Sequence, residues 1–305
     1  MKTAFLFVGQ GAQKVGMGRD FYENFPEVRA IYDDSGLDFD LRACSFEGPQ
    51  EKLTDTAYAQ SCLLAASYAM ALCLKNNGVE AEMTAGLSLG EYTALTYAGV
   101  FSVKDALKIT RKRGELMAHA LPEGTGMMAA VLGAEEALIA EACAEASALG
   151  VCGIANYNSP GQIVISGATE AVKKAAALLK ARGVRRVLPL KVSGAFHSPL
   201  LKEAAGELAA LLSGIDMQKP RIPVVSNVDG TAKDRDLRAV LTRQMYSPVY
   251  FERGIRTMLA QGVDTFVEVG PGRALSGFVK KIDPAVRILN VEDVKTFEQA
   301  LTALA

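Results

Sequence analysis

The sequence contains no tryptophan and only two histidines, and it carries no excess of charge of one sign. With 33 Lys and Arg against 34 Asp and Glu, the chain gives no global signal for binding a polyanion such as nucleic acid. Any imidazole chemistry is restricted to His119 and His197. The five cysteines form no Cys-x-x-Cys pair and lie mostly in apolar stretches, so we expect buried free thiols.

Long hydrophobic runs are also lacking. The most apolar segment, residues 62–74, has 13 residues, fewer than the roughly 20 that a bilayer-spanning helix needs. The apolar run at the N-terminus ends at Gly9, which is too short for the core of a secretion signal and indicates a first strand. We therefore expect a soluble, cytoplasmic protein without a membrane partner. Half of the 305 residues are hydrophobic, enough for a substantial core in one or two domains.

The first and last thirds of the chain alternate strands with helices, which indicates a parallel α/β sheet. In the first third, strands are predicted at 3–8 and 82–86, and helices at 60–76, 89–98 and from the Ser102–Asp105 capping box to His119. In the last third, helices are predicted at 199–212, 237–245 and 251–261, strands at 222–226 and 265–270, and a final helix after the turn GPGR.

The middle of the chain has a different order. Strands are predicted at 126–132, 151–156, 162–166 and 184–190, with helices at 135–148 and 169–182. This β-α-β-β-α-β order is typical of a ferredoxin-like α+β unit. Loop-like sequences at 121–126 and 192–199 bracket it. We expect a large α/β domain from 1–124 and 192–305, with an inserted small ferredoxin-like subdomain at 125–191.

The motif GLSLGEYTAL places Ser88 between Gly86 and Gly90, after a predicted strand and before a predicted helix. This context is typical of the nucleophile elbow of α/β-hydrolase-like domains, in which a sharp turn exposes the serine. The amide of Leu89, at the helix N-terminus, would face the charge that develops on attack. An ordinary small-residue turn is the alternative in a chain with 28 glycines, and the spacing alone does not decide between them.

A serine nucleophile needs a base. His119 ends an amphipathic helix, where an imidazole commonly only favours the helix C-terminus. His197 lies in the loop GAFHSP between the predicted subdomain and the large domain, where a cleft residue is expected, although an incidental loop histidine is the alternative. Arg113, in the run RKR, looks by itself like part of a solvated helix face.

Several further motifs occur in a fixed order along the chain: FVGQGAQ (7–13), TxxxQ (56–60), GLSLGEY (86–92), RGELM (113–117), NYNSPGQIVISG (156–167), GAFHS (194–198), PVVSNVDG (223–230), RQMYSPV (243–249) and EVGPG (268–272). With these motifs the chain resembles the malonyl-CoA:acyl carrier protein transacylases, which are similar to the acyltransferase domains of polyketide synthases. The resemblance covers nearly the whole chain.

The resemblance implies a role for individual residues. Ser88 would be the acylated nucleophile and His197 its base, oriented by the backbone carbonyl of Gln244. The amides of Gln10 and Leu89 would form the oxyanion hole.

Substrate-binding roles are implied in the same way. Arg113 would hold the free malonyl carboxylate, which agrees with the bidentate fit of a guanidinium to a carboxylate. Gln60 would also contact the substrate. Phe196 occupies a position at which related acyltransferases have phenylalanine when they use malonyl rather than branched acyl groups. One departure is Leu87, where the family usually has a histidine; it puts in doubt only the details of the pocket.

The resemblance implies a ping-pong mechanism. The malonyl group passes from malonyl-CoA to Ser88, and then from Ser88 to the phosphopantetheine thiol of acyl carrier protein. No tightly bound cofactor or metal is expected, since the partner carries the phosphopantetheine. The alternatives are a discrete acyltransferase of a polyketide pathway and a serine thioesterase that uses water as acceptor.

The segment 171–202 has no Asp or Glu but eight Lys and Arg: Lys173, Lys174, Lys180, Arg182, Arg185, Arg186, Lys191 and Lys202. A solvated basic face is one interpretation. The other is a docking surface for an acidic carrier protein that includes Arg185, Arg186 and Lys191. The enzyme itself is expected to be a monomer.

Overall fold

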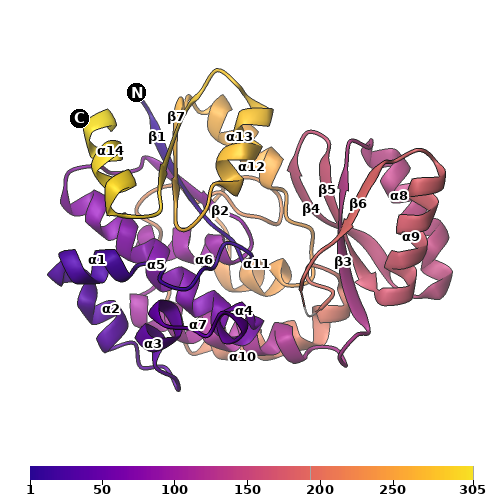
Figure 1. The fold of residues 1–305 in the computed structure, drawn as a ribbon, viewed down its shortest axis with the longest axis horizontal. Helices are drawn as coiled ribbons and strands as arrows, with labels where there is room; N and C mark the ends of the chain where they lie inside the picture. Colours follow the sequence, from indigo (N-terminus) through magenta and orange to yellow (C-terminus); the bar gives the residue numbers. More distant parts are fainter. Residues whose placement is uncertain (193, 305) are drawn as a thin grey trace.

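The computed structural model describes residues 1–192 and 194–304 and contains two β-sheets in separate lobes (Figure 1). Ser193, in the predicted loop 192–199, and Ala305 lie outside the described residues. The larger lobe holds a parallel sheet in the order β2-β1-β7-β8. Its strands are β1 (Thr3–Phe7), β2 (Met83–Gly86), β7 (Thr265–Val269) and β8 (Arg287–Val291).

Helices surround this sheet. They are α1 (Arg19–Asn24), α2 (Arg29–Asp33), α3 (Leu41–Phe46), α4 (Gln50–Thr54), α5 (Thr56–Asn76), α6 (Leu89–Tyr97), α7 (Val103–His119), α10 (Lys202–Ser213), α11 (Leu237–Gln244), α12 (Phe251–Ala260), α13 (Ala274–Ile282) and α14 (Val294–Leu304). Every residue of β1 and β7 is buried, as expected for parallel strands that helices cover on both faces.

Helix α5, with 21 residues, is the longest helix among the described residues. By length and composition it could cross a membrane, but 83% of its apolar window is buried inside the protein. It therefore forms the core of the larger lobe, and the all-round apolar sequence reflects burial on every side.

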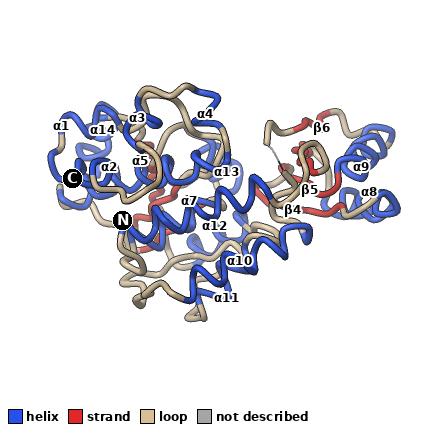
Figure 2. Tube along the Cα trace, turned by 90° about the horizontal axis from the view of Figure 1, so that it is seen from below, coloured by secondary structure: helices blue, strands red, loops and turns tan. Residues whose placement is uncertain are grey.

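The smaller lobe is the ferredoxin-like unit. Its elements are β3 (Gly126–Leu132), α8 (Glu136–Ala146), β4 (Cys152–Ser159), β5 (Gln162–Ala168), α9 (Thr169–Ala181) and β6 (Arg186–Pro189). The sheet order β4-β5-β3-β6 is antiparallel throughout, and the unit has its own hydrophobic cluster. Figure 2 shows its strands and two helices at one end of the molecule. The predicted boundaries between the large domain and the small subdomain, at 124/125 and 191/192, remain predictions.

The two lobes are joined by hydrogen bonds as well as by the chain. The Val249 amide donates to Ala155 O at 2.8 Å, and the Tyr157 amide donates to Val249 O at 2.9 Å. The rings of Tyr157 and Tyr250 stack with centroids 5.0 Å apart. Strand β4 of the smaller lobe is thus attached to the segment that follows α11.

The predicted strand at 222–226 is wrong. Only one parallel bridge forms there, between Thr84 and Val224, through the Thr84 amide to Pro223 O and the Val225 amide to Thr84 O. Proline lacks an amide hydrogen, so a segment with Pro220 and Pro223 cannot extend a ladder. The sequence predictions also lack β8, the short helices α1 to α4 and the second of the two helices after GPGR, α14, and they start α5 four residues too late.

Candidate active site

Ser88 lies in a strained turn between β2 and α6, with φ 54° and ψ −101°. Both neighbouring glycines are required sterically. A Cβ on Gly86 would lie 2.0 Å from the carbonyl carbon of Gly90, and a Cβ on Gly90 would lie 2.1 Å from Phe7 O. The G-x-S-x-G spacing therefore describes a turn that packs directly against β1, and the fold has the nucleophile elbow that the sequence predicts.

The side chain of Asn227 holds this turn. Its Oδ1 accepts the Ser88 amide at 2.7 Å, and its Nδ2 donates to Gly86 O at 2.7 Å. The carboxamide thus satisfies one peptide group on each side of the bend. Asn227 is buried and comes from the loop after Val225, about 140 residues from the serine.

Ser88 and His197 are in direct contact. Ser88 Oγ lies 2.8 Å from His197 Nε2, and His197 Nδ1 lies 2.8 Å from the backbone oxygen of Gln244. A carbonyl can only accept, so Nδ1 carries the proton and Nε2 is free to accept from the serine hydroxyl. His197 also has a positive φ of 56°, and its amide donates to Met245 O at 3.1 Å.

His119 lies elsewhere. It is at the last residue of α7, and its Nδ1 is 2.9 Å from Glu115 O, one turn earlier in the same helix. It forms no hydrogen bond with Ser88 or Arg113 in the described part of the chain, which agrees with the interpretation of this imidazole as a helix-terminal group.

Arg113 is fully buried beside the serine, so the solvated helix face considered for the RKR run is wrong for this residue. Its Nη2 donates to Ser88 Oγ at 3.1 Å and to Gln244 Oε1 at 2.9 Å, and its Nη1 donates to Gln60 Oε1 at 2.7 Å. The guanidinium lies over the ring of Tyr92, 5.1 Å from its centroid.

No carboxylate forms a salt bridge with Arg113 among residues 1–192 and 194–304, and its Nε has no hydrogen-bond partner there. Burial lowers the pKa of Arg113, but a guanidinium remains charged at neutral pH. A buried cation with only neutral partners is poised to bind an anion. Burial, and then this positive charge, lower the pKa of His197 from 6.5 to about 4.

Gln244 and Glu91 complete the polar network. Gln244 Nε2 donates to Ser88 O at 2.9 Å and to Glu91 Oε2 at 2.8 Å, while Glu91 Oε2 also accepts the Asn227 amide at 3.2 Å. Burial raises the pKa of Glu91. The sequence reading assigned only the backbone carbonyl of Gln244 and missed Glu91 and Asn227. The signal available was their place in the motifs GLSLGEY and PVVSNVDG.

A cavity of about 480 Å³ opens onto Ser88 and His197 between the two lobes. Gln10, Leu87 and Phe196 are also in its wall, with Met128, Asn156 and Leu190 from the smaller lobe and Phe278 from the larger one. Leu87 thus adds an apolar side chain beside the nucleophile.

The two predicted oxyanion-hole amides belong to residues at this site. Gln10 follows β1, and its side chain donates to Thr56 Oγ1 at 2.8 Å; Leu89 begins α6. Neither amide donates a hydrogen bond within the part of the chain that the structure describes. The cavity wall includes Ser88, His197, Gln10 and Phe196. Arg113 connects Ser88 to Gln60 and Gln244 by hydrogen bonds. Leu89 directly follows Ser88 in the chain.

Metal-ligating side chains do not gather here. The described residues contain no group of three or more His, Cys, Asp or Glu that could hold a metal ion. The five cysteines are unpaired, four of them buried and Cys152 half-buried.

A serine in a strained elbow, in contact with a histidine and a buried arginine, is an arrangement typical of acyl-transfer and hydrolase sites. Residues 4–291 match the family model described as "Acyl transferase domain". The chain belongs to this acyl transferase family.

Relatives within the family have a common description. The chain is 44% identical over 308 residues to a malonyl CoA-acyl carrier protein transacylase of Bacillus subtilis, covering 99% of this chain and 97% of the relative. The same description applies to an Escherichia coli protein that is 44% identical over 284 residues, covering 92% of each chain.

Solved structures agree. A malonyl CoA-acyl carrier protein transacylase from Clostridium perfringens superposes with a TM-score of 0.96 at 42% identity, covering 100% of this chain and 97% of that one. A malonyl-transacylase solved in complex with a type II polyketide acyl carrier protein superposes with a TM-score of 0.95 at 39% identity. The match covers 99% of this chain and 100% of that one.

Proposed function

We propose that this enzyme transfers the malonyl group from malonyl-CoA to the phosphopantetheine thiol of acyl carrier protein, through a malonyl ester on Ser88, for fatty-acid synthesis. The observation that carries the proposal is Arg113, a fully buried cation 3.1 Å from Ser88 Oγ with no carboxylate partner in the described chain. An acyl group with a free carboxylate supplies the missing anion, which an acetyl group lacks. The names of the relatives support this choice.

In the first half-reaction His197 Nε2 takes the Ser88 hydroxyl proton while Oγ attacks the thioester carbonyl. The geometry of the Ser88–His197 contact, at 2.8 Å, supports this step. The amides of Gln10 and Leu89 stabilise the oxyanion. When the carbonyl re-forms, the carbon–sulfur bond breaks, and the CoA sulfur takes the proton from His197.

The second half-reaction runs the same steps with a different thiol. His197 removes the proton of the phosphopantetheine thiol, and the thiolate attacks the malonyl ester. The ester bond to Ser88 Oγ then breaks, and the serine regains the proton from His197. The Gln244 carbonyl keeps His197 in the tautomer that both halves require.

Arg113 changes partners during this cycle. In the free enzyme it donates to Ser88 Oγ, Gln60 Oε1 and Gln244 Oε1. Binding of the malonyl carboxylate diverts one edge of the guanidinium to the ligand and neutralises its charge. The pKa of His197 then rises toward its ordinary value, since Arg113 is one of the causes that lower it. Phe196 contributes to the wall of the acyl pocket.

The carrier protein docks on the exposed basic surface of the smaller lobe, formed by Arg185, Arg186 and Lys191 at and beside strand β6. Other cations of this segment are less available, because Arg182 pairs with Glu145 and Lys173 pairs with Glu170. An acidic partner would be steered to the unpaired cations. The enzyme acts as a cytoplasmic monomer, independent of nucleic acid and membrane, without a tightly bound cofactor.

Intact-mass measurement tests the proposal. The enzyme is incubated with malonyl-CoA or acetyl-CoA, and acyl carrier protein is then added. We expect a malonyl adduct that is absent in Ser88→Ala and is cleared by the carrier protein. Rapid loss of the adduct without the carrier would instead identify a thioesterase.

A second pathway is favoured by one relative, the malonyl-transacylase seen with a type II polyketide carrier protein. Comparing kcat/KM for a fatty-acid carrier and a polyketide carrier separates the two pathways. A higher value with the polyketide carrier would assign the enzyme to polyketide synthesis.

A further inference from the structure

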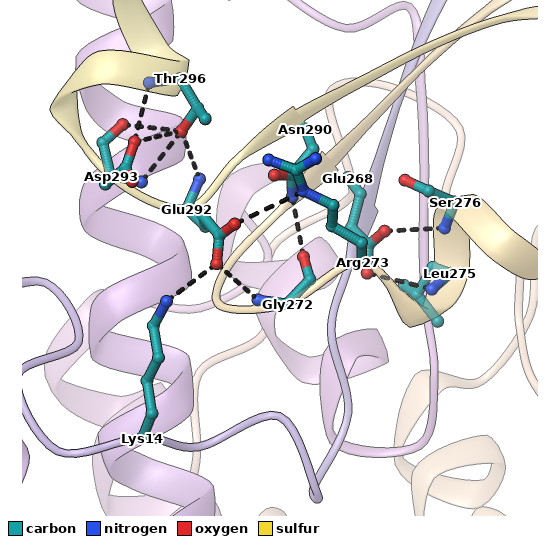
Figure 3. Close-up of polar contacts among 10 residues, drawn as sticks. All are labelled: Lys14, Glu268, Gly272, Arg273, Leu275, Ser276, Asn290, Glu292, Asp293 and Thr296. Atoms are coloured by element: carbon teal, nitrogen blue, oxygen red, sulfur yellow. Dashed lines mark hydrogen bonds and ion pairs between the residues drawn. The ribbon is translucent and has the colours of Figure 1, made fainter.

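The wall of the active-site cavity carries few charged groups. Glu268 is the one Asp, Glu, Lys or Arg among the described lining residues, and His197, which also lines the cavity, is neutral at pH 7. Its Oε1 accepts the Leu275 amide at 3.0 Å and its Oε2 accepts the Ser276 amide at 2.7 Å (Figure 3). Both carboxylate oxygens are therefore used to cap the N-terminus of α13, and these two amides are not available to an external anion.

Two cations stand where lining segments of this cavity end. Lys14 is two residues after Ala12, and Arg273 directly follows Gly272; both Ala12 and Gly272 line the cavity. The side chains of Lys14 and Arg273 are 55% and 67% exposed. They are surface groups next in sequence to residues that line the cavity.

Glu292 holds these two cations in place (Figure 3). Its Oε2 lies 2.8 Å from Lys14 Nζ and accepts the Gly272 amide at 3.2 Å, and its Oε1 lies 3.5 Å from Arg273 Nε. The Lys14 ammonium lowers the pKa of Glu292. The two Nη groups of Arg273 have no hydrogen-bond partner within residues 1–192 and 194–304, so the fork of the guanidinium is available.

A third cation contacts a lining residue of the smaller lobe. Lys281 Nζ, from α13, donates to Gln162 Oε1 of the smaller lobe at 3.4 Å, and Gln162 lines the cavity. Lys281 is one turn after Phe278, which also lines it. Lys14, Arg273 and Lys281 thus each adjoin or contact a residue that lines the cavity, and Glu292 pairs with the first two.

We propose that Lys14, Arg273 and Lys281, the rim cations, bind the 4′-phosphate of the pantetheine arm. The inference rests on the proposed function, because malonyl-CoA and the carrier protein present the same arm with a thiol at one end and this phosphate at the other. A cavity wall with a single carboxylate, already bonded to two amides, suits the uncharged arm, and the phosphate at the far end of the arm needs cations. One site then serves both half-reactions, and it is separate from the carrier-docking surface around Arg185.

The test compares donors that differ only at the phosphate end: malonyl-CoA, malonyl-4′-phosphopantetheine and malonyl-pantetheine. The variant is Arg273→Gln/Lys281→Gln, since Lys14 shares a loop with Gln10. The control is Lys108→Gln/Lys295→Gln, which removes two exposed lysines of α7 and α14 and so changes the net charge equally. The quantity measured is the ratio of kcat/KM with each phosphorylated donor to kcat/KM with malonyl-pantetheine.

We expect both ratios to fall about tenfold in the rim variant, because each lost contact is a charge-assisted hydrogen bond. The control should keep the wild-type ratios. An unchanged ratio in the rim variant overturns the proposal. So does a fall with malonyl-CoA alone, which would place these cations on the nucleotide phosphates. If wild-type enzyme transfers malonyl from none of the three donors, the proposed function fails instead.

Discussion

The carboxamide of Asn227 bridges the two peptide groups that flank Ser88, accepting from the Ser88 amide and donating to Gly86 O, each at 2.7 Å. Ser88 has a positive φ that costs energy for a non-glycine residue, and this bridge offsets part of that cost. The side chain that holds the elbow thus comes from a distant part of the chain.

Asn227→Asp keeps the acceptor but replaces the donor to Gly86 O with a carboxylate oxygen, next to buried Glu91. We expect kcat to fall about tenfold or more while KM for malonyl-CoA changes little, because the nucleophile is displaced rather than the pocket. Single-turnover acylation of Ser88, followed by mass, measures the effect. Asn24→Asp, on the exposed end of α1, is the control, and equal rates in both variants would remove Asn227 from the positioning machinery.

Arg113→Gln should lower kcat/KM for malonyl-CoA by about tenfold to a hundredfold, since a charge-assisted contact with the carboxylate is lost. The value for acetyl-CoA should fall far less, so the preference for malonyl disappears. Steady-state kinetics with both donors gives the two values. Retention of the malonyl preference would contradict the role assigned to the guanidinium.

The low pKa of His197 predicts the acid limb of activity. His197 must be neutral to act as a base, so kcat/KM of the wild type should hold well below pH 6.5 and fall toward about 4. In Arg113→Gln the acid limb should move to higher pH, because a positive charge that lowers the pKa is removed. The shift should be partial, since burial is the larger cause. An identical acid limb in both proteins would show that Arg113 does not act on His197.

Stability should depend on pH through the same group. Folded His197 has a pKa of about 4 against 6.5 for the unfolded reference, so between these values only the unfolded chain binds the extra proton. The contribution of neutral His197 to the free energy of unfolding is fully present above pH 6.5. It is lost as the pH falls toward 4, and the total loss is about 3 kcal/mol. Denaturant unfolding of wild type and His197→Gln across this range measures it. If the free energy of unfolding depends on pH in the same way in both proteins, His197 does not have the lowered pKa that this prediction uses.

Gly90→Ala should destabilise the fold by at least about 2 kcal/mol or displace the elbow, because its Cβ would lie 2.1 Å from Phe7 O. Gly206→Ala, in α10, meets nothing within 4 Å and should stabilise by about 0.5–1 kcal/mol. Thermal unfolding of the two variants measures these effects: the melting temperature should fall in Gly90→Ala and rise in Gly206→Ala relative to the wild type. Similar melting temperatures would contradict the close packing of the elbow on β1.

Arg185→Glu/Arg186→Glu should raise KM for acyl carrier protein about tenfold at low salt, with a smaller effect at high salt, because an acidic partner is then repelled. KM for malonyl-CoA should stay close to that of Lys108→Glu/Lys295→Glu, the charge-matched control. An unchanged KM for the carrier protein would remove these arginines from the docking surface.

Much of this site could be predicted from local sequence. The elbow is encoded by Gly86, Ser88 and Gly90 within five residues, and the ferredoxin-like order by the alternation of β-branched strands and helices. Asn227 and Glu91 could not be assigned in this way, because their roles arise from contacts between segments more than 130 residues apart. Arg113 looked exposed in the run RKR, since local charge says nothing of which face of α7 is packed. The strand at 222–226 was overpredicted because its apolar residues are interrupted by Pro223.

Gln244 and Val249 lie five residues apart on one short segment, and they connect to different lobes. The Gln244 carbonyl fixes the tautomer of His197, while Val249 pairs with β4 on both its amide and its carbonyl. One short stretch of backbone therefore sets the proton position on His197 and attaches the opposite wall of the cavity to the larger lobe. A change in this stretch would disturb the imidazole and the lobe junction together.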